Sequence, residues 1–590
     1  MAAAASGASQ KSNANVQATD ILTHVTFASC NRQSADQSFW MKSIASTIAA
    51  QREKGGAGNS SKPHTDLLLW LGNAVYADVD EAGVAISSAR HIDSIKQEYK
   101  LLIDNLHYRE FVKHVVGAGG RVSGIWDDRD LAWRGADGSY AQSEAIRHLY
   151  LTHIWNGYPL SAMDVVGDST PGALYSFNGI PAPAGTPLAA HFVHSVCTIT
   201  LDVRTQRTAP PNLVDALLHT TLAEAPDVRA RVMEADLLGR RQWAWLERTL
   251  ATYLTPTASS PGDAAGRAHC AVTLIASPWQ ILLNDNKPFE GWDLYPASRS
   301  RLLLLLKKYD VERFVFLSGH AELGEVGVMR RASKTDLHKE GPTVSLADNA
   351  SLGLVTPPAE KLLPPRRSSL VEVTSSGLTH TLRDAPLVGR LARWFITPRV
   401  AEDTEDDGLA KRRILLTRTT TMERQFGTLQ IIGDREATKT HAGAATAPRE
   451  EVLTRTRVLI TLHSVQRAGA PLVTIERTLK NLPSYAVDPD EGEEKEEGAL
   501  MTTDIYDAAH LPTLRVYLSP GDYPWLKQRV LELQCVEVPC VKGKHFMLLK
   551  VIANLAIAFV FAMVFISALY CFQLKYPNVF AEEHVKLKQD

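Results

Sequence analysis

Four short clusters of polar residues hold side chains that could bind a metal ion or a phosphate. The clusters are ASCN at 28–31, LGNAVYAD at 71–78, IWDDRD at 125–130 and LSGHAELGE at 317–325. Each follows an apolar run typical of a buried strand, and in α/β folds ligands bind outside the carboxyl ends of strands. Together the clusters offer a thiol, an amide, a phenol, an imidazole and several carboxylates. Oxygen ligands suit hard cations, whereas a thiolate or an imidazole suits iron or zinc.

The cluster IWDDRD needs a positive partner, because it places three carboxylates within four residues. Without a cation, repulsion between Asp127, Asp128 and Asp130 would raise the pKa of at least one of them. We therefore expect either a metal ion or an arginine to neutralise this cluster.

Each of these residues also has a plainer explanation. Cys30 alone is more often a small buried hydrophobic residue, and His320 can be a hydrogen-bonded loop histidine. Asn73 and Asp130 can serve as turn or cap residues. Only the complete set of clusters, taken together, indicates a metal site.

Strands alternating with helices are the elements that must position these clusters. Before residue 330 the predicted strands are His24–Ala28, Asp66–Leu71, Arg121–Trp126, Cys197–Val203, Ala271–Ile275 and Arg313–Leu317. The predicted amphipathic helices are Gly239–Leu254 and Ser298–Tyr309. Further strands are predicted at Leu370–Val373, Thr428–Ile432, Val458–Leu462 and Leu472–Ile475. This alternation is typical of a sheet covered by helices.

The composition argues against some partners and compartments. The chain has 590 residues, with 63 Lys and Arg against 65 Asp and Glu, and a formal net charge of −2. A charge so close to zero argues against a nucleic-acid partner held by bulk charge. The six cysteines, at 30, 197, 270, 535, 540 and 571, are too few and too scattered for a disulfide framework or a paired C-x-x-C zinc site. A reducing compartment is therefore expected.

One segment near the end of the chain fits a transmembrane helix better than a buried core helix, because a globular helix of this length usually carries a charged face. Val551–Phe572 has 22 residues without a charge, and as a helix it would span about 33 Å, enough to cross a membrane. Lysines precede this segment, whereas acidic residues offset the lysines that follow it, a weak bias that places the preceding domain in the cytosol. The first residues lack the apolar run of a signal peptide. We expect a single-pass C-terminal anchor in an organelle membrane that the sequence does not identify.

These features divide the chain into five parts. We expect a flexible tail at 1–20, a main domain at 21–485 with insertions at about 331–367 and 400–412, an acidic linker and juxtamembrane segment at 486–545, a transmembrane helix at 546–575 and a short tail at 576–590. The insertions and the linker are rich in Pro, Ser, Lys or acidic residues, which is typical of solvated segments.

Eight motifs, in their order and spacing, resemble those of the PhoD-type alkaline phosphatases over about residues 22–480. The motifs are FASCNRQ from Phe27, LLLWLGNAVYAD from Leu67, GIWDDRD from Gly124, LDVRTQR from Leu201, LLGRRQWAWLERTL from Leu237, SPWQILLNDNKPFEGWDLYPASRSRLLLLL from Ser277, VFLSGHAELGE from Val315 and VTSSGLTH from Val373. The resemblance implies an α/β, metallophosphoesterase-like four-layer sandwich of two mixed sheets flanked by helices. It also implies metal-assisted hydrolysis of phosphate mono- or diesters, with iron and, in the best-known members, calcium.

Carried over by position, the resemblance makes Cys30 a thiolate ligand and Tyr76 the tyrosine of the second motif. The chain also departs from the family. Asn73 stands where the family has an aspartate that bridges two metals, and a neutral amide bridges poorly. Arg129 replaces the histidine of the usual WDDHD, and Arg134 stands at a downstream asparagine ligand. A guanidinium has no free lone pair and cannot ligate a metal.

The last ligand motif is reversed. The family has Gly-Asp-x-His, whereas this chain has Gly319, His320, Ala321 and Glu322, so both ligand types remain in exchanged order. The predicted metal-binding residues are Cys30, Asn73, Tyr76, Asp127, Asp128, His320 and Glu322. The predicted catalytic residues are Asp128, Arg129 and Arg134, and the predicted phosphate-binding residues are Asn31, Arg129 and Arg134.

Charge decides how many metal ions the site is expected to hold. Relative to the family, the site loses up to three units of negative charge, and each charge pair at 4 Å is worth about 4 kcal/mol at an effective dielectric of 20. That is enough to abolish a second metal, so we expect one ion, of iron, calcium or zinc, with an arginine clamping the phosphate.

Three classes of function fit these residues. The first is a membrane-anchored, PhoD-like phosphoesterase with a modified metal site. The second is a catalytically silent phosphatase fold that serves as a scaffold on a membrane, in which an arginine takes the metal position and pairs with the aspartates. The third is a module that binds a phosphorylated ligand through Arg129, Arg134, Arg204 and Arg207. For Arg204 and Arg207, structural ion pairs at a strand end are the more common explanation.

Overall fold

The structure is a computed structural model. It describes residues 19–54, 64–78, 92–155, 173–208, 235–256, 266–282, 290–331, 344–345, 369–384, 413–434 and 447–485. The predicted linker, transmembrane helix and C-terminal tail lie outside the described residues, as do nearly all of the N-terminal tail and all of the insertion at 400–412. Among the described residues, no helix has both the length and the apolar character needed to cross a membrane.

The first of two sheets contains six strands in the order β14-β13-β12-β1-β2-β3. Its strands are β1 (Thr19–Ala28), β2 (Leu67–Leu71), β3 (Arg121–Ile125), β12 (Gln425–Asp434), β13 (Arg457–Ser464) and β14 (Pro471–Thr478). β1 is parallel to β2 and antiparallel to β12, so the sheet is mixed. The carboxyl ends of β1, β2 and β3 therefore lie along one edge.

The second sheet contains eight strands in the order β4-β5-β6-β7-β10-β8-β11-β9. Its strands are β4 (Ser176–Pro181), β5 (Phe192–Thr200), β6 (Ala268–Ser277), β7 (Phe314–Ser318), β8 (Gly324–Arg331), β9 (Val344–Ser345), β10 (Ser369–Ser375) and β11 (Arg413–Thr421). β5, β6, β7 and β10 run parallel, and the remaining pairings are antiparallel.

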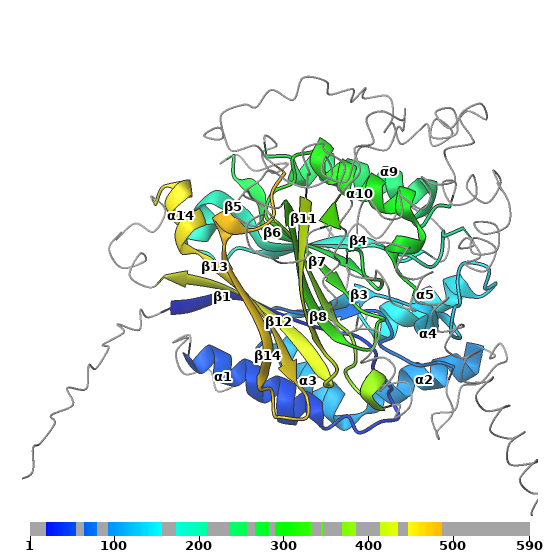
Figure 1. Cartoon of the computed structure of the whole chain (residues 1–590). Coiled ribbons are helices and arrows are strands. Elements are labelled where there is room, and N and C mark those ends of the chain that lie inside the picture. The colour runs from blue at the N-terminus through cyan, green and yellow to red at the C-terminus, as the bar shows by residue number, and fades with distance from the viewer. Residues whose placement is uncertain are drawn as a thin grey trace, which may run out of the picture.

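Helices pack on the outer faces of both sheets, and two short helices that contain Leu188 and Val452 pack beside the core between the sheets. They are α1 (Ser46–Lys54), α2 (Ile92–Asp104), α3 (Leu106–Gly117), α4 (Asp128–Leu131), α5 (Ser143–His153), α6 (Pro187–His191), α9 (Gly239–Thr249), α10 (Pro296–Lys308) and α14 (Arg449–Arg455). In Figure 1, α1, α2 and α3 lie on one side of the molecule and α9 and α10 on the opposite side, with the strands between them.

The two-residue period of the strands explains this layering. In β2, Leu68 and Trp70 pack toward the helices, whereas Leu69 and Leu71 pack against the other sheet. β7 repeats the pattern, because Phe314 and Phe316 face the helices while Val315 and Leu317 face the first sheet. The apolar residues thus form one core between the sheets and one under each helical layer. This is the α/β arrangement of two mixed sheets flanked by helices that the sequence predicts.

Predicted and observed elements agree best where strands are apolar. Each predicted strand overlaps an observed one, with the largest offset at β5, which the prediction placed several residues too late. The predicted helix at Gly239–Leu254 is observed as α9 followed directly by a short helical turn. The prediction missed β4, β8 and β11, whose glycine, proline, threonine, arginine or other polar residues weaken the apolar signal. It also missed β9, a two-residue strand within the insertion predicted at 331–367.

The cysteines correct one expectation. Cys197 of β5 and Cys270 of β6 form a disulfide, although 73 residues separate them in the sequence. The expectation of reduced cysteines is wrong for this pair, because neighbouring strands bring together residues whose spacing in the sequence gives no hint of proximity. Cys30, by contrast, is a free and buried thiol.

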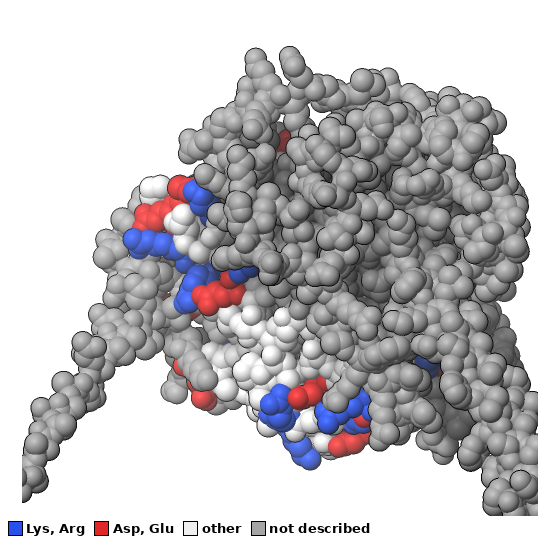
Figure 2. All heavy atoms as spheres, viewed as in Figure 1, with Lys and Arg blue, Asp and Glu red and all other residues white. Residues whose placement is uncertain are grey.

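The surface carries both signs of charge. On the face seen in Figure 2, Lys and Arg lie beside Asp and Glu over the described residues. Arg457 and Glu476 are 2.6 Å apart, and Arg467 and Glu423 are 3.0 Å apart. Exposed pairs of this kind contribute at most about 1 kcal/mol each, so they help solubility more than stability.

Candidate functional site

The loops that follow β1 and β2 are joined through their backbones. The amide of Cys30 donates to the carbonyl of Gly72 at 3.4 Å, and the amide of Asn31 donates to the carbonyl of Asn73 at 2.8 Å. These bonds follow from the parallel pairing of the two strands, which carries both chains past the sheet edge at the same level. The first two polar clusters therefore meet, as the sequence predicts.

The loop after β7 reaches the same place. Gly319 approaches so closely that a Cβ atom there would lie 2.2 Å from the carbonyl oxygen of Leu71 and 2.6 Å from the hydroxyl of Ser29. Only glycine permits this approach. The residue that follows, His320, is thereby brought beside the loops of the first sheet.

Four of the predicted ligands have an unusual backbone conformation. Seven non-glycine residues of the described chain have a positive φ angle. Four of the seven are Cys30 (58°), Asn73 (50°), His320 (62°) and Glu322 (51°). A left-handed conformation costs such residues about 1–2 kcal/mol each and is concentrated at functional sites. The strain therefore marks these loop ends as a candidate site.

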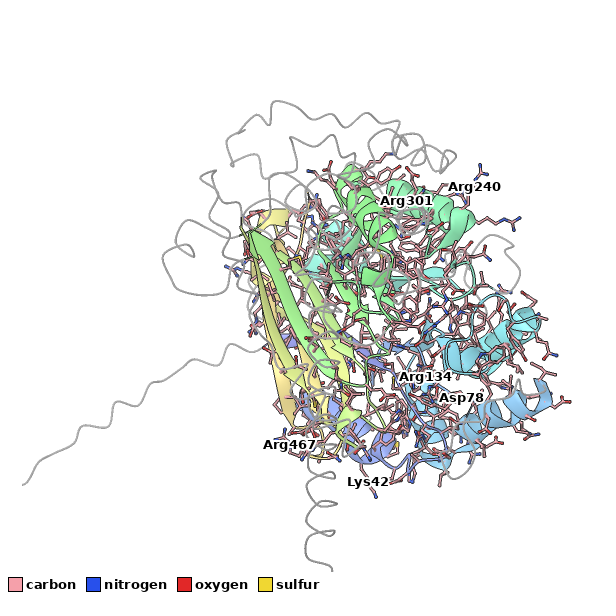
Figure 3. The ribbon with its side chains drawn as sticks, turned by 45° about the vertical axis from the view of Figure 1, so that its right-hand side comes forward. Lys42, Asp78, Arg134, Arg240, Arg301 and Arg467 are labelled. Carbon is pink, nitrogen blue, oxygen red and sulfur yellow. A yellow bond between two sulfur atoms is a disulfide. The ribbon has the colours of Figure 1, made fainter. Side chains whose placement is uncertain are left out.

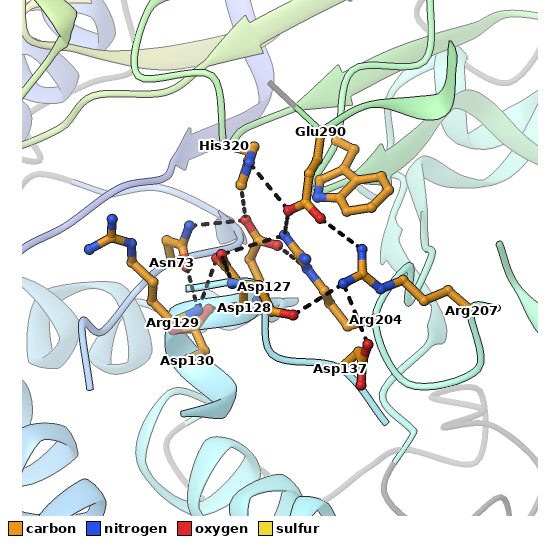
Figure 4. Close-up of polar contacts among 12 residues, drawn as sticks. Asn73, Asp127, Asp128, Arg129, Asp130, Asp137, Arg204, Arg207, Glu290 and His320 are labelled. Carbon is orange, nitrogen blue, oxygen red and sulfur yellow. Dashed lines mark hydrogen bonds and ion pairs between the residues drawn. The ribbon is translucent and has the colours of Figure 1, made fainter. Parts of the chain in front are cut away.

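Asp127 lies at the centre of the site (Figure 4). One of its carboxylate oxygens accepts a bond from Arg204 Nε at 2.6 Å, and the other is 2.6 Å from His320 Nδ1 and 2.9 Å from Asn73 Nδ2. Burial alone would raise the pKa of Asp127, but Arg204 and His320 together lower it well below its usual range. The pKa of His320 is raised in turn, because the attraction of Asp127 outweighs burial.

Asp128 is held by the chain that surrounds it. Its carboxylate accepts backbone N–H groups from Arg129 at 3.0 Å and from Gly135 at 2.8 Å. Asp127, Asp128 and His320 each place one ligand atom within 4.8 Å of the other two. Two carboxylate oxygens and one imidazole nitrogen fit a borderline cation such as zinc, iron or manganese.

Arg204 provides the positive charge that the aspartates need. Its side chain is fully buried and lies 3.8 Å from Asp128 and 2.8 Å from Glu290, in addition to its bond with Asp127. Its guanidinium also lies over the ring of Trp279, with 4.6 Å to the ring centroid. The expectation that an arginine or a metal neutralises the cluster is thus met by an arginine from LDVRTQR, not by one from the WDDRD region.

Arg207 extends the same ionic network. It is 2.8 Å from Glu290 and 3.6 Å from Asp137. Structural ion pairs, the more common explanation for Arg204 and Arg207, therefore describe both residues. Glu290 bridges the two guanidiniums, and this bridge escaped the sequence analysis.

Asp130 does not join the cluster of charges. Its two oxygens accept the backbone N–H groups of Val75 at 2.9 Å and of Asp127 at 2.9 Å, so it links the second and third loops. Burial raises its pKa well above the usual range of a carboxyl group. The plainer explanation, a cap residue, is the right one here.

A second half of the site surrounds Cys30. Its sulfur is 3.1 Å from the hydroxyl of Ser376, and it packs against Tyr76. The hydroxyl of Tyr76 is 3.0 Å from His380 Nε2, which is 3.6 Å from Glu322. Burial, assisted by the charge of Glu322, raises the pKa of Cys30 to about 11. The thiol is therefore neutral unless a cation stabilises its thiolate.

Arg129 lies between the two halves. Its guanidinium is 3.3 Å from Asp78 and lies over the ring of Tyr76, with 4.4 Å to the ring centroid. Burial would lower its pKa, but the charges of Asp78, Asp128 and Glu322 help to raise it. Arg129 is therefore a permanently charged group between the two halves of the site, and its predicted role in phosphate binding stays a prediction.

Two of the predicted phosphate-binding residues have other surroundings. The side chain of Arg134 is exposed, and its backbone N–H bonds to Asp78, which is labelled with it in Figure 3. Asn31 is fully buried, and its amide group donates to the carbonyl of Ala74 at 3.1 Å. The side-chain oxygen of Asn31 has no hydrogen-bond partner, which suits a cation better than a phosphate.

Sequence reasoning missed Glu290 and His380 and gave Arg204 too small a role. His380 is the last residue of VTSSGLTH, and Arg204 is the central arginine of LDVRTQR, so both belong to motifs that the sequence analysis had already singled out. Their positions after β10 and β5 were the available signal, because those strands run parallel to β7 in the same sheet.

The sequence matches no family model and no curated protein. A solved structure described as "Structure of PhoD" is similar with a TM-score of 0.34 and 12% sequence identity, covering 79% of this chain and 74% of that chain. A likeness at this level carries no conclusion about activity. The resemblance to the PhoD-type phosphatases stays a prediction, and function has to follow from the residues of the site.

Proposed function

We propose that the chain is a metal-dependent phosphoester hydrolase that works with a single metal ion. The observation that carries this proposal is the convergence of Asp127, Asp128 and His320 at the carboxyl ends of the strands, with ligand atoms within 4.8 Å of one another. The positive φ angles of His320 and Asn73 support it, since strained backbones of this kind are concentrated at functional sites.

The residues around the triad suit a phosphate ester. An ion held by Asp127, Asp128 and His320 would act as a Lewis acid on a phosphoryl oxygen. Arg129 is the guanidinium placed between the two halves of the site, and guanidinium groups bind phosphate oxygens in pairs. The proposed substrates are phosphate mono- or diesters.

A second candidate is a silent phosphatase fold that acts as a scaffold. The observation that favours it is the set of direct ion pairs of Arg204 with Asp127 and Asp128. These pairs already balance the charges that would hold a metal, so an ion must compete with a buried guanidinium. The two candidates therefore differ in one measurable property, which is whether a cation enters the triad.

Metal content measured together with turnover separates the two candidates. The full chain is loaded with iron, zinc or manganese, and hydrolysis of a generic phosphodiester is followed. The hydrolase predicts one bound ion per chain and turnover that falls on the order of 100-fold in Asp128→Asn, which keeps the size of the side chain. Glu423→Gln, on the surface pair with Arg467, is the control and should change neither quantity. Absence of both metal and turnover in the unmodified chain would leave the scaffold.

We also propose that the segment at 546–575 anchors the chain to a membrane, with the main domain on the cytosolic side. The support for this is its 22-residue run without a charge. Fractionation of cells that express a chain lacking residues 546–590 tests the anchor. Persistent membrane association of the truncated chain would point to another attachment.

A further inference from the structure

Four side chains of β5 and β6, in the second sheet, are of types that bind zinc and lie close together, away from the strand-end site. His194 and Cys197 belong to β5, and His269 and Cys270 belong to β6, its parallel neighbour. One ligand atom each of His194, Cys197 and His269 lies within 4.8 Å of the others, and the sulfur of Cys270 is bonded to that of Cys197. All four residues are at most 7% exposed.

We propose that these residues bind one Zn²⁺ ion as a Cys₂His₂ site when the disulfide between Cys197 and Cys270 is reduced. The position thus has two alternative forms, a disulfide and a zinc complex. The proposal is independent of the strand-end site and of the activity proposed for it.

The distances fit a tetrahedral ion. With Zn–S of about 2.3 Å and Zn–N of about 2.0 Å, the ligand atoms of a tetrahedral site are about 3.3–3.8 Å apart. The two imidazoles and the sulfur of Cys197 need only small shifts from their present spacing to reach these values. Reduction frees the two sulfurs to move apart to the separation that zinc requires.

Charge favours an ion at this depth. Two thiolates and one Zn²⁺ sum to zero, and two neutral imidazoles complete the shell without adding charge. Both rings are buried, and a neutral imidazole has one nitrogen with a free lone pair that can bind a metal ion. A neutral complex avoids the large cost of placing a net charge among apolar side chains.

The surroundings of His194 point to a missing partner. Its Nδ1 atom is buried and makes no hydrogen bond, which is uncommon for a polar atom inside a protein. Its ring lies so close to β4 that a Cβ atom at Gly179 would be 2.3 Å from it, so glycine at this position leaves the space that the ring occupies. His269 is fixed by contacts with the rings of Phe177 and Tyr253, at centroid distances of 5.7 and 4.7 Å.

The exchange between the two forms is balanced with a phosphine as reductant. The phosphine attacks one sulfur and breaks the S–S bond, water then supplies oxygen to phosphorus, and the products are a phosphine oxide and two thiols. Zinc binding displaces the proton of each thiol, so two protons leave as one Zn²⁺ enters. An added cyclic disulfide such as oxidised dithiothreitol takes two electrons and two protons to become a dithiol, while the two protein thiolates form the disulfide again and release the ion.

The test uses the full chain with the strand-end site disabled by Asp128→Asn and His320→Ala, so that bound zinc reports on the second site. The chain is reduced with a water-soluble phosphine, desalted and titrated with Zn²⁺ alone. We expect one tightly bound zinc per reduced chain, none on the disulfide form, and loss of binding in Cys270→Ser. Cys30→Ser and the double variant Cys535→Ser/Cys540→Ser should retain the ion.

A measurement that needs no variant at the four residues protects the test against misfolding. X-ray absorption at the zinc edge of the reduced, zinc-loaded chain should show two sulfur neighbours at about 2.3 Å and two nitrogen neighbours at about 2.0 Å. A reduced chain with titratable thiols that binds no zinc overturns the proposal. A shell without two sulfurs, or zinc that persists in Cys270→Ser, overturns it equally.

Discussion

The strand-end triad and the β5–β6 cluster solve the same electrostatic problem in different ways. At the strand ends, Asp127 and Asp128 are neutralised by Arg204, a cation that the chain itself supplies. Between β5 and β6, Cys197 and Cys270 avoid charge by forming a disulfide. An ion entering the first region must displace a guanidinium, whereas an ion entering the second needs only reduced thiols. The comparison teaches that ligand geometry alone does not decide metal binding. The group that already neutralises the ligands, Arg204 in one region and the disulfide in the other, matters as much.

Removal of Arg204 tests the first region most severely. Arg204→Met leaves two buried carboxylates without their cation, and breaking a buried pair in this way costs about 3–5 kcal/mol. Urea unfolding of the metal-free chain should show a loss of that size, and added zinc or manganese should restore part of it. Arg467→Met, which breaks an exposed pair, is the matched control and should cost less than about 1 kcal/mol. A loss no larger than the control's would show that Arg204 does not balance the triad.

Reduction tests the second region. The disulfide closes a loop of 73 residues, and its loss should lower the free energy of unfolding by about 2–4 kcal/mol. Zinc added after reduction should recover stability, because it binds the folded chain. Unfolding curves of oxidised, reduced and reduced zinc-loaded chain check this. If the reduced chain were equally stable with and without zinc, the proposed zinc complex of the reduced chain would be contradicted.

Substitution of Asn73 tests whether more negative charge beside Asp127 favours a metal ion in the strand-end site. Its amide donates to Asp127, so Asn73→Asp replaces a hydrogen bond by repulsion between two carboxylates. We expect a loss of about 1–3 kcal/mol in the metal-free chain and tighter binding of a divalent ion. Calorimetric titration of both chains with Mn²⁺ measures the affinity. Weaker binding in the variant would mean that Asn73 does not face the ion.

The two regions should respond to pH with opposite sign. The pKa of His320 is raised by Asp127, so its contribution to stability is present below pH 6.5 and is lost as pH rises through the folded pKa. Burial lowers the pKa of His269 to about 4. As pH falls from 6.5 to 4, the unfolded chain gains a proton on His269 before the folded chain does, so the free energy of unfolding falls by about 1.4 kcal/mol per pH unit.

Unfolding free energies of His320→Ala and His269→Gln, measured from pH 4 to 8, separate these effects. The difference between the unmodified chain and His320→Ala should shrink toward high pH. The difference between the unmodified chain and His269→Gln should shrink toward low pH. If both differences in unfolding free energy changed with pH in the same direction, the proposed electrostatic difference between the two regions would be wrong.

Truncation should have the smallest effect on both regions. A chain lacking residues 546–590 should leave the membrane fraction while its unfolding curve and its metal binding stay unchanged. A change in either would show that the C-terminal segment contributes to one of the two regions.

The layered fold could be predicted because its central strands are continuous apolar runs, as in β2 and β7. The convergence of the loops at the strand ends followed from the same pattern. The partner of Asp127 could not be predicted, because several motifs contain an arginine and only the packing of Trp279 and Glu290 around Arg204 selects one. The cluster of Cys197 and Cys270 was also hidden, since it depends on the pairing of β5 with β6 and not on sequence spacing.

The most direct test of the account is a crystal of the full chain grown with Mn²⁺ or Zn²⁺ and measured at the absorption edge of the metal. The account predicts an anomalous peak bounded by Asp127, Asp128 and His320, with the guanidinium of Arg204 shifted away from Asp127. A map with no peak there, and with Arg204 still paired to Asp127, would contradict it.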